Sequence, residues 1–206
     1  MENILVSFAP ALLPSIILLL LVLKRTEYRK RVVLVFATGY FAAIPALLLA
    51  VSIPVPTPVI RAYLAAGLVE ETVKLLLILV ATPKSGGRTP VAAAAGMGFA
   101  GFENLLTPQI PSILLLRSVT ALPLHLATCL IMARLVDGRA NQLTRSEHSF
   151  GLWLGTLSIG VVIHGTYDLS LFLPPPFPLF VVPMSVSLMG ISFMLLRQWW
   201  RESSSG

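Results

Sequence analysis

Charged side chains are scarce in this chain of 206 residues: 12% are Asp, Glu, Lys or Arg, whereas 56% are hydrophobic. Soluble domains typically contain about 25% charged and about 45–50% apolar residues. Because so few charges cannot cover the surface of a small soluble protein, the composition predicts an integral membrane protein. Cysteine is scarce as well. The single Cys129 cannot form an intrachain disulfide, which excludes a disulfide-rich extracellular scaffold.

The chain also lacks a polar segment long enough to hold a separate folded domain. Its connections are short and rich in proline and glycine. The longest polar stretch runs from Asp137 to Ser149, and we expect it to be a cytoplasmic loop in which His148 is solvated. No direct or inverted repeat is visible. The sequence therefore predicts a single transmembrane domain over residues 1–206.

Long apolar runs are abundant. A helix that crosses the bilayer needs about 20 mainly apolar residues. The segments that meet this requirement are approximately 4–23, 32–53, 61–82, 89–107, 112–134, 150–173 and 178–197. The first segment has neither a preceding basic residue nor a small-residue cleavage site, so we interpret it as an anchor. The predicted fold class is all-α, a polytopic membrane bundle of about seven helices.

Lysine and arginine gather at one set of predicted helix ends. Twelve of the fifteen basic residues follow the first, third, fifth and seventh segments: Lys24, Arg25, Arg29, Lys30, Arg31, Lys84, Arg88, Arg134, Arg139, Arg145, Arg197 and Arg201. The opposite ends hold only Arg61 and Arg117. Cytoplasmic loops carry an excess of Lys and Arg, so we expect the N-terminus outside and the C-terminus in the cytoplasm. The net charge of +6 then needs no nucleic-acid partner.

Several ionisable residues lie inside the predicted spans, where each charge costs several kcal/mol and marks a functional site by default. They are Glu70, Glu71, Lys74, Glu103, His125, His164 and Asp168. Counted from the cytoplasmic ends, the glutamates and histidines share a layer about 8 Å thick near the midplane, at 1.5 Å per residue. We therefore predict a site there. The alternative is a polar network that only holds the bundle together.

Spacing predicts how some of these residues pair. Glu70 and Lys74 are four residues apart with the glutamate first, which is the favourable order, so Lys74 is expected to neutralise a carboxylate. His164 and Asp168 share a face in the same way, and the aspartate can fix the tautomer of the imidazole. Asn104 adds an amide donor beside the acid of the fourth span.

Three known kinds of intramembrane protease are excluded. The chain has no His-Glu-x-x-His zinc motif, and no second aspartate lies within a span to share a proton with Asp168. The segment Ser158-Ile159-Gly160 is a poor match to a glycine-rich serine motif, and His164 stands on the same helix. A centre of glutamate and histidine remains.

Four motifs follow one another along the middle of the chain. Val69–Lys74 reads VEETVK, Phe99–Asn104 reads FAGFEN, His125 stands in the fifth span, and His164–Asp168 reads HGTYD. In this order they resemble the Glu-Glu-x-x-Lys, Phe-x-x-x-Glu-Asn and histidine motifs of the PrsW family of intramembrane proteases. The resemblance covers the spans over residues 61–173, the predicted catalytic core.

The resemblance implies a multi-pass protein of the inner (cytoplasmic) cell membrane that cleaves a membrane-bound, single-span protein. For the bacterial family that substrate is an anti-sigma factor, cut at the first site of regulated proteolysis in a stress response. It also implies kinship with CaaX prenyl proteases and with bacteriocin-processing or self-immunity proteins. The CaaX branch has His where this chain has Glu103, so its mechanism does not transfer directly.

Two mechanisms stay open from the sequence. Without a metal, Glu70 or Glu71 is the general base for a buried water, and His164 with Asp168 or Asn104 donates to the oxyanion. With zinc, the ligands are Glu103, His125 and His164, a two-histidine, one-carboxylate set with an open position. In both, the expected catalytic residues are Glu70, Glu71, Glu103, His125, His164 and Asp168, with Lys74 and Asn104 in support.

Two functions of other classes remain as alternatives. Acids and histidines at the midplane also serve as proton relays or cation sites in transporters and channels. Such proteins often show repeats and broken helices in matched positions, and neither is visible here. A non-catalytic immunity or sorting protein on the same scaffold is expected to lose the motif glutamates, which are intact in this chain.

Overall fold

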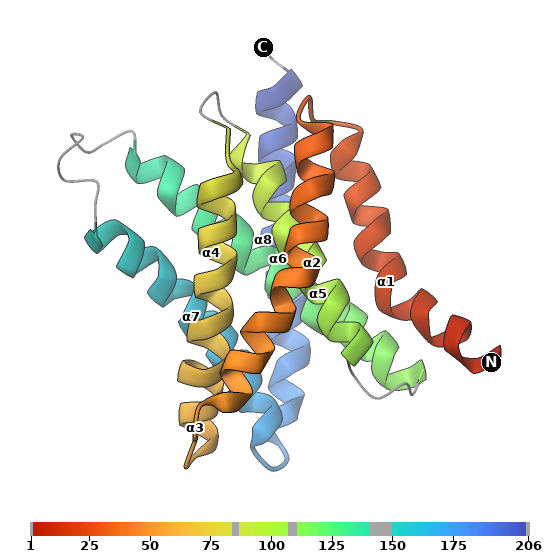
Figure 1. Ribbon diagram of the computed structural model, residues 1–206, viewed down its shortest axis with the longest axis vertical. Coiled ribbons are helices and arrows are strands. Elements are labelled where there is room, and N and C mark those ends of the chain that lie inside the picture. The colour runs from red at the N-terminus through yellow and green to blue at the C-terminus, as the bar shows by residue number, and fades with distance from the viewer. Residues whose placement is uncertain (1, 84–86, 107–110, 141–149, 205–206) are drawn as a thin grey trace.

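Helices form nearly all of the structure (Figure 1). The computed structural model describes residues 2–83, 87–106, 111–140 and 150–204, and no strand occurs among them. The elements are α1 (Glu2–Leu23), α2 (Arg29–Ser52), α3 (Pro58–Ile60), the π-helix η1 (Arg61–Leu68), α4 (Val69–Ala81), α5 (Arg88–Leu106), α6 (Pro111–Ala140), α7 (Phe150–Phe172), the 3₁₀-helix η2 (Phe177–Phe180) and α8 (Val181–Ser204). The all-α prediction is confirmed.

Every predicted apolar segment coincides with a helical segment, but some boundaries differ from expectation: the last segment, expected over 178–197, begins as η2 and continues as α8 to Ser204. The segment predicted over 61–82 begins as α3, widens into η1 and continues as α4. The segment predicted to end at 134 continues to Ala140, so Asp137–Ala140 is helical and not loop. An ion pair between Arg88 and Asp137 holds this extension against the start of α5. His148 lies outside the described residues.

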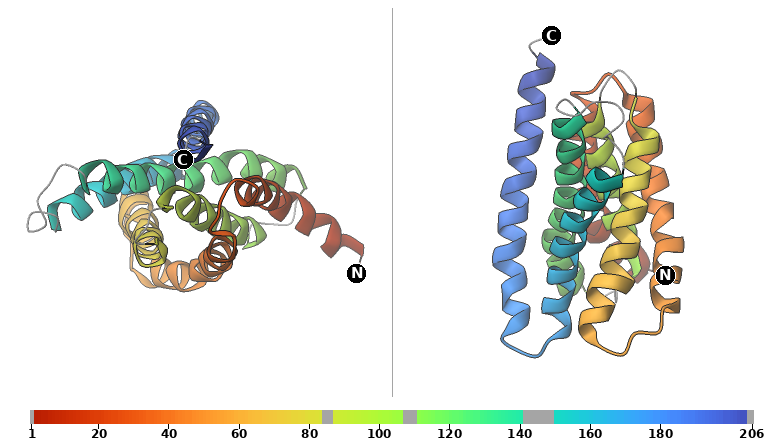
Figure 2. Two further views of the ribbon diagram at one scale, coloured as in Figure 1. Left: turned by 90° about the horizontal axis from the view of Figure 1, so that it is seen from above. Right: turned by 90° about the vertical axis from the view of Figure 1, so that its left-hand side faces the viewer.

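The central helix is α5, which packs against α1, α2 and α6. Its side chains from Thr89 to Gly101 are all buried. Small residues allow this close packing, because a Cβ added to Gly96 would lie 2.4 Å from the carbonyl oxygen of His125, and one added to Gly98 would lie 2.2 Å from that of Phe36. Seen from above, α8 lies on one side of α6, and α2 and α4 lie on the other (Figure 2).

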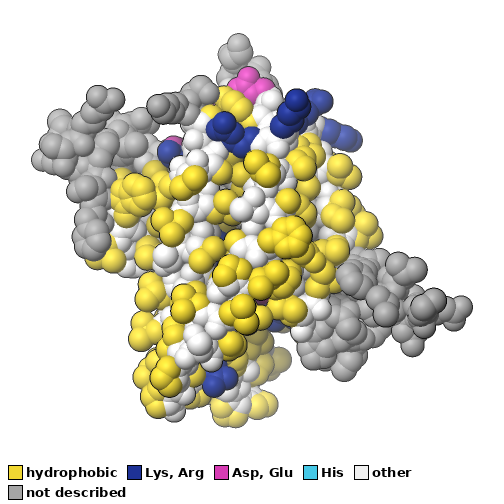
Figure 3. Space-filling view, viewed as in Figure 1, with side chains coloured by type: hydrophobic (Ala, Val, Ile, Leu, Met, Phe, Trp, Pro, Cys, Tyr) yellow, Lys and Arg dark blue, Asp and Glu magenta, His cyan; other side chains and the backbone are white. Residues whose placement is uncertain are grey.

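Hydrophobic side chains cover much of the face of the bundle that Figure 3 shows. Large hydrophobic side chains such as Leu34, Phe41, Leu48 and Val51 of α2 are between 62% and 70% exposed. Contiguous apolar surface of this kind is typical of a lipid-facing helix and not of a soluble monomer. By length and composition, three helical stretches of the described chain are apolar enough to cross a membrane: Arg29–Ser52, Leu115–Asp137 and Phe177–Ser203.

Basic side chains gather at one end of the bundle, the upper end in Figure 3. The turn between α1 and α2, which includes Lys24 and Arg25, lies at this end, as do the end of α4 and the C-terminal end of α8 (Figure 1). Helix α3 lies at the opposite end. The basic connections therefore lie at the same end of the bundle, as the predicted membrane topology requires. Which side faces the cytoplasm stays a prediction.

Candidate active site

The helix that carries Glu70, Glu71 and Lys74 is irregular just before these residues. The eight residues of η1 form a π-helix, and π-helical turns are rare and frequent at functional sites. Regular α-helix resumes at Val69. Glu70 and Glu71 are the second and third residues of α4, directly after the change of winding. Both are buried, with exposed fractions of 7% and 0%.

Helix α7 approaches η1 closely and brings His164 to α4. A Cβ added to Gly165 would lie 2.3 Å from the ring of Tyr63, so only glycine admits the ring there. The hydroxyl of Tyr63 lies 2.9 Å from that of Thr166 and fixes the contact. A Cβ on Gly67 would lie 3.3 Å from the carbonyl oxygen of Val161. These contacts position His164 one residue from the place where the helices meet.

The ammonium of Lys74 lies at the middle of the cluster. Its Nζ is 2.7 Å from Glu71 Oε1 and 3.6 Å from Glu70 Oε2. The pairing predicted with Glu70 is therefore present, but Glu71 is the closer partner. Nζ also lies 2.7 Å from His125 Nδ1 and 4.6 Å from the centre of the Phe99 ring. The phenylalanine of the FAGFEN motif thus covers the charge and excludes water from it.

His164 lies among three carboxylates. Its Nδ1 is 2.7 Å from Glu71 Oε1, and its Nε2 is 3.5 Å from both Glu70 Oε2 and Asp168 Oδ2. The predicted pairing with Asp168 is therefore observed. The ring centroid of His164 is 5.3 Å from that of His125, with the two planes nearly perpendicular. The two imidazoles thus share one buried space although they belong to α7 and α6.

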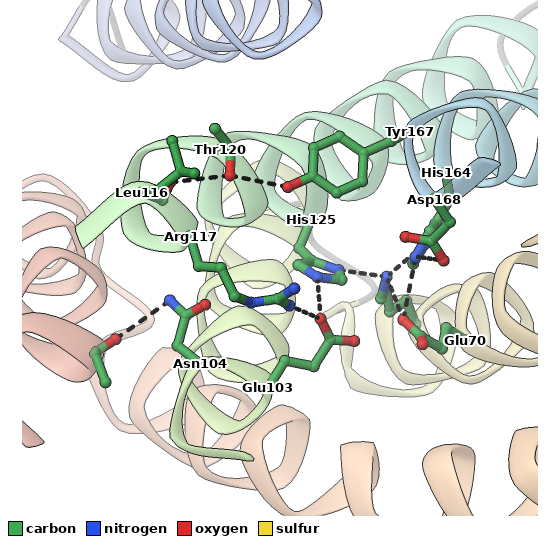
Figure 4. A network of polar contacts seen from close by, with 12 residues as sticks. Glu70, Glu103, Asn104, Leu116, Arg117, Thr120, His125, His164, Tyr167 and Asp168 are labelled. Carbon is green, nitrogen blue, oxygen red and sulfur yellow. Dashed lines mark hydrogen bonds and ion pairs between the residues drawn. The ribbon is translucent and has the colours of Figure 1, made fainter. Parts of the chain in front are cut away.

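Glu103 orients His125 instead of facing His164. Its Oε2 lies 3.0 Å from His125 Nε2 and 3.1 Å from the guanidinium of Arg117 (Figure 4). The sequence assigned Arg117 only to membrane orientation. The residue precedes His125 by eight positions, about two helical turns, so both lie on one face of α6. That spacing is the signal in the sequence that points to Arg117.

Asn104 does not face the cluster, which corrects the role expected for it. Its side-chain amide donates to the backbone carbonyl of Ala11 at 3.4 Å, and Figure 4 shows it directed toward α1. Asn104 follows Glu103 directly, and successive helical side chains point about 100° apart. In this helix the two side chains point to different partners, Glu103 to His125 and Asn104 to Ala11. Asn104 thus links α5 to α1.

The donor atoms of Glu70, His125 and His164 all lie within 4.8 Å of one another, and all three side chains are buried. Two imidazoles and one carboxylate match a known catalytic zinc set. Glu70 Oε2 is buried and accepts no hydrogen bond from any described residue. The carboxylate of this set is thus Glu70, whereas Glu103 was expected. Both nitrogens of His125 already have partners, Lys74 and Glu103, so a metal ion would have to replace one of them.

A cavity of about 410 Å³ reaches Glu70 from the side of α2 and η1. Its walls are mainly apolar and include Leu47 and Val51 of α2 and Ala65 and Ala66 of η1. Glu71 is fully buried and is not among the lining residues. Of the two neighbouring glutamates, therefore, Glu70 is the one accessible to a molecule that enters the bundle.

The structure brings together most of the residues that the sequence singled out: Glu70, Glu71, Lys74, Glu103, His125, His164 and Asp168. They come from α4, α5, α6 and α7. The glutamates and histidines that were expected at one depth in the membrane therefore form one contiguous cluster. Asn104 is outside the cluster, and Arg117 is an additional member that sequence reasoning missed.

No curated protein and no solved structure matches the chain. A family model described as "PrsW family intramembrane metalloprotease" matches residues 27–196, which include every residue of the cluster. The matched region extends beyond the motifs to α2 and most of α8. The chain therefore belongs to the PrsW family, a family of membrane-embedded proteases.

Proposed function

We propose that this chain is an intramembrane endopeptidase whose catalytic centre is the buried cluster around Lys74. The observation that carries the proposal is the convergence of donor atoms of Glu70, His125 and His164 within 4.8 Å of one another, next to a cavity that Glu70 lines. Family membership supports hydrolysis of a peptide bond. The buried Oε2 of Glu70 accepts no hydrogen bond from the described residues, so it is available to a water molecule or to a substrate.

Glu70 is the proposed general base. It lines the cavity, and its Oε2 is free of hydrogen bonds to the described residues, so it can accept the proton of a water that attacks the scissile carbonyl. Glu71 is less suited because its Oε1 is engaged by both Lys74 and His164. Glu71 is proposed to hold these two side chains in place.

His164 is the proposed proton carrier. Its Nδ1 is 2.7 Å from Glu71 Oε1 but 3.4 Å from Lys74 Nζ, and the shorter contact places a proton on Nδ1, donated to Glu71. Its Nε2 then faces Glu70 and Asp168. From there it can receive the proton taken by Glu70 and donate it to the leaving amine.

Lys74 and His125 are proposed to stabilise negative charge. The ammonium of Lys74 donates to His125 Nδ1, which leaves the imidazole proton on Nε2, donated to Glu103. The ammonium is fully buried, so its charge acts at low dielectric, where it stabilises a developing oxyanion more strongly than it would in water.

The residues present also fit a metal ion, which the family description implies. Glu70, His125 and His164 would hold it. A zinc ion bound there would lower the pKa of a water and polarise the scissile carbonyl. Glu70 would then be a ligand, and Glu71, whose Oε2 has no hydrogen-bond partner among the described residues, would be the carboxylate left to accept the proton.

We further propose a multi-pass arrangement in the inner membrane with the N-terminus outside and the C-terminus in the cytoplasm. The common position of the basic helix ends supports it. The proposed substrate is a single-span membrane protein. An anti-sigma factor is the specific proposal, and the resemblance to the bacterial family supports it.

The test is cleavage of a single-span reporter by the purified protein in liposomes. We expect E70Q, which keeps the shape of the side chain, to lose about 10²–10⁴ in rate because the base is removed. H164A should lose a similar factor. E27Q is the matched control, since Glu27 is exposed and lies outside the spans, and it should cleave like the wild type.

Equal rates for the wild type and both site variants would contradict the proposal. Metal dependence is measured on the same preparation, by elemental analysis and by incubation with a chelator. One metal ion per chain, loss of activity on chelation and recovery with Zn²⁺ indicate the metal mechanism. Full activity without metal indicates that Glu70 acts as the base directly.

A further inference from the structure

Arg61 stands at the mouth of the cavity that leads to Glu70. It lines this cavity of about 410 Å³ and also an adjacent one of about 270 Å³. Both cavities are further bounded by Val55 and Phe172. Arg61 begins η1, at the end of the bundle opposite the basic connections (Figure 1). A substrate polypeptide that extends from one cavity into the other would therefore pass the guanidinium of Arg61.

The guanidinium of Arg61 has no partner within the part of the protein that the structure describes. No hydrogen bond or ion pair joins it to these residues, and the side chain is exposed. Arg117, the other basic residue near that end, is by contrast paired with Glu103. The remaining walls of the larger cavity are apolar, apart from Glu70. An anionic group from outside the chain would complete this site.

We propose that Arg61 binds an acidic side chain of the substrate and thereby sets where the substrate is cut. The inference rests on the proposed protease function and names the chemistry of the substrate. The substrate has an Asp or Glu in an extended segment close to the membrane surface, with apolar residues between that acid and the scissile bond. The apolar residues contact the walls formed by Leu47, Val51 and Ala66.

The spacing between Arg61 and Glu70 predicts how far the acidic residue of the substrate lies from the scissile bond. The two residues are nine positions apart in one continuous helical stretch, about 13.5 Å along the axis at 1.5 Å per residue. An extended chain covers about 3.3 Å per residue. The acidic residue is therefore expected about four residues from the bond that is cleaved.

The experiment uses three single-span reporters that differ only at this position, with Asp, Asn or Lys, and the full-length protein in liposomes. For the wild type we expect the Asp reporter to be cleaved about three- to fivefold more efficiently than the Asn reporter, the range for one partly solvated ion pair. R61E should invert the order and favour the Lys reporter. R61K should retain the preference for Asp.

R29E is the matched control, because Arg29 has the same charge, is exposed and lies at the opposite end of the bundle. It should keep the wild-type order. The same order in R61E as in the wild type would overturn the inference while leaving the protease function intact. If the wild type cleaves none of the three reporters, the proposed function fails and this inference fails with it.

Discussion

At the scale of residues, the cluster is organised around a single cation. Lys74 contacts carboxylates of α4 and an imidazole of α6. Around it, Arg117 holds Glu103, and Glu103 holds His125. Carboxylate partners of this kind fix the tautomer and ring orientation of a histidine. Arg117 thus acts on the orientation of His125 indirectly, through Glu103.

We therefore expect R117Q to reduce cleavage by about 10- to 100-fold, the usual cost of losing such an orienting contact. The reporter assay in liposomes measures it, and kcat should fall more than KM rises because substrate binding is not touched. R134Q is the matched control on the same helix, since Arg134 forms an exposed pair with Glu202 at 3.5 Å, which is worth little. Equal loss in both variants would show that Arg117 has no specific role.

Residue types inside the spans predicted most of the site, because buried charges in a membrane are costly and stand out in an apolar sequence. Asn104 and Arg117 could not be placed in this way. Asn104 depends on the rotation of α5, and that rotation follows from the packing of glycines and alanines against α2 and α6. The sequence does not show whether Arg117, a single basic residue near a helix end, lies at the membrane surface or pairs with a carboxylate inside the bundle.

At the scale of elements, the site depends on how closely α7 approaches α4. A Cβ added to Gly160 would lie 3.2 Å from Glu71 Oε2 and 3.3 Å from Met132 Sδ. The lack of a side chain at this position therefore leaves room for the carboxylate. Gly151 lies on the same helix and has nothing within 4 Å of the same methyl position.

G160A should lower activity about tenfold, because the added methyl group displaces the Glu71 carboxylate by a fraction of an ångström, and misplacement by 1 Å can cost about 10²-fold. Both G160A and G151A should gain helix propensity, up to about 1 kcal/mol. Thermal unfolding in detergent and the reporter assay together separate the two effects. Reduced activity in G151A, or unchanged activity in G160A, would contradict the assigned contact.

The helices themselves were predictable from the length of the apolar runs, and their observed bounds lie close to the expected ones. The π-helix η1 was not, because hydrophobic length carries no information on winding when nearly every side chain is apolar. The extension of α6 to Ala140 was also missed. It depends on the pair between Arg88 and Asp137, which joins residues far apart in sequence.

At the scale of the whole molecule, the bundle places its basic connections at one end and α3 at the other (Figures 1 and 3). If the basic end is cytoplasmic, the mouth at Arg61 opens on the outer side. A substrate segment would then be cut from the side opposite the C-terminus. In this orientation the protease would act on substrate segments outside the cytoplasm and not on cytoplasmic tails.

Reporter fusions test this orientation. A fluorescent protein that folds only in the cytoplasm should be active when fused after residue 206, and a phosphatase that folds only outside should be active when fused at the N-terminus. A fusion to the α1–α2 turn, near Arg25, should behave like the C-terminal one. The reverse pattern would place the cavity mouth on the cytoplasmic side.

Hydrolysis at Glu70 is the central claim, and the most direct measurement is mass spectrometry of a single-span reporter incubated with the protein in H₂¹⁸O. With the wild type we predict two fragments, one of which carries a single ¹⁸O in its new C-terminal carboxyl group. With E70Q we predict an intact reporter over the same time. Intact reporter with the wild type, or equal labelled fragments with E70Q, would contradict the account.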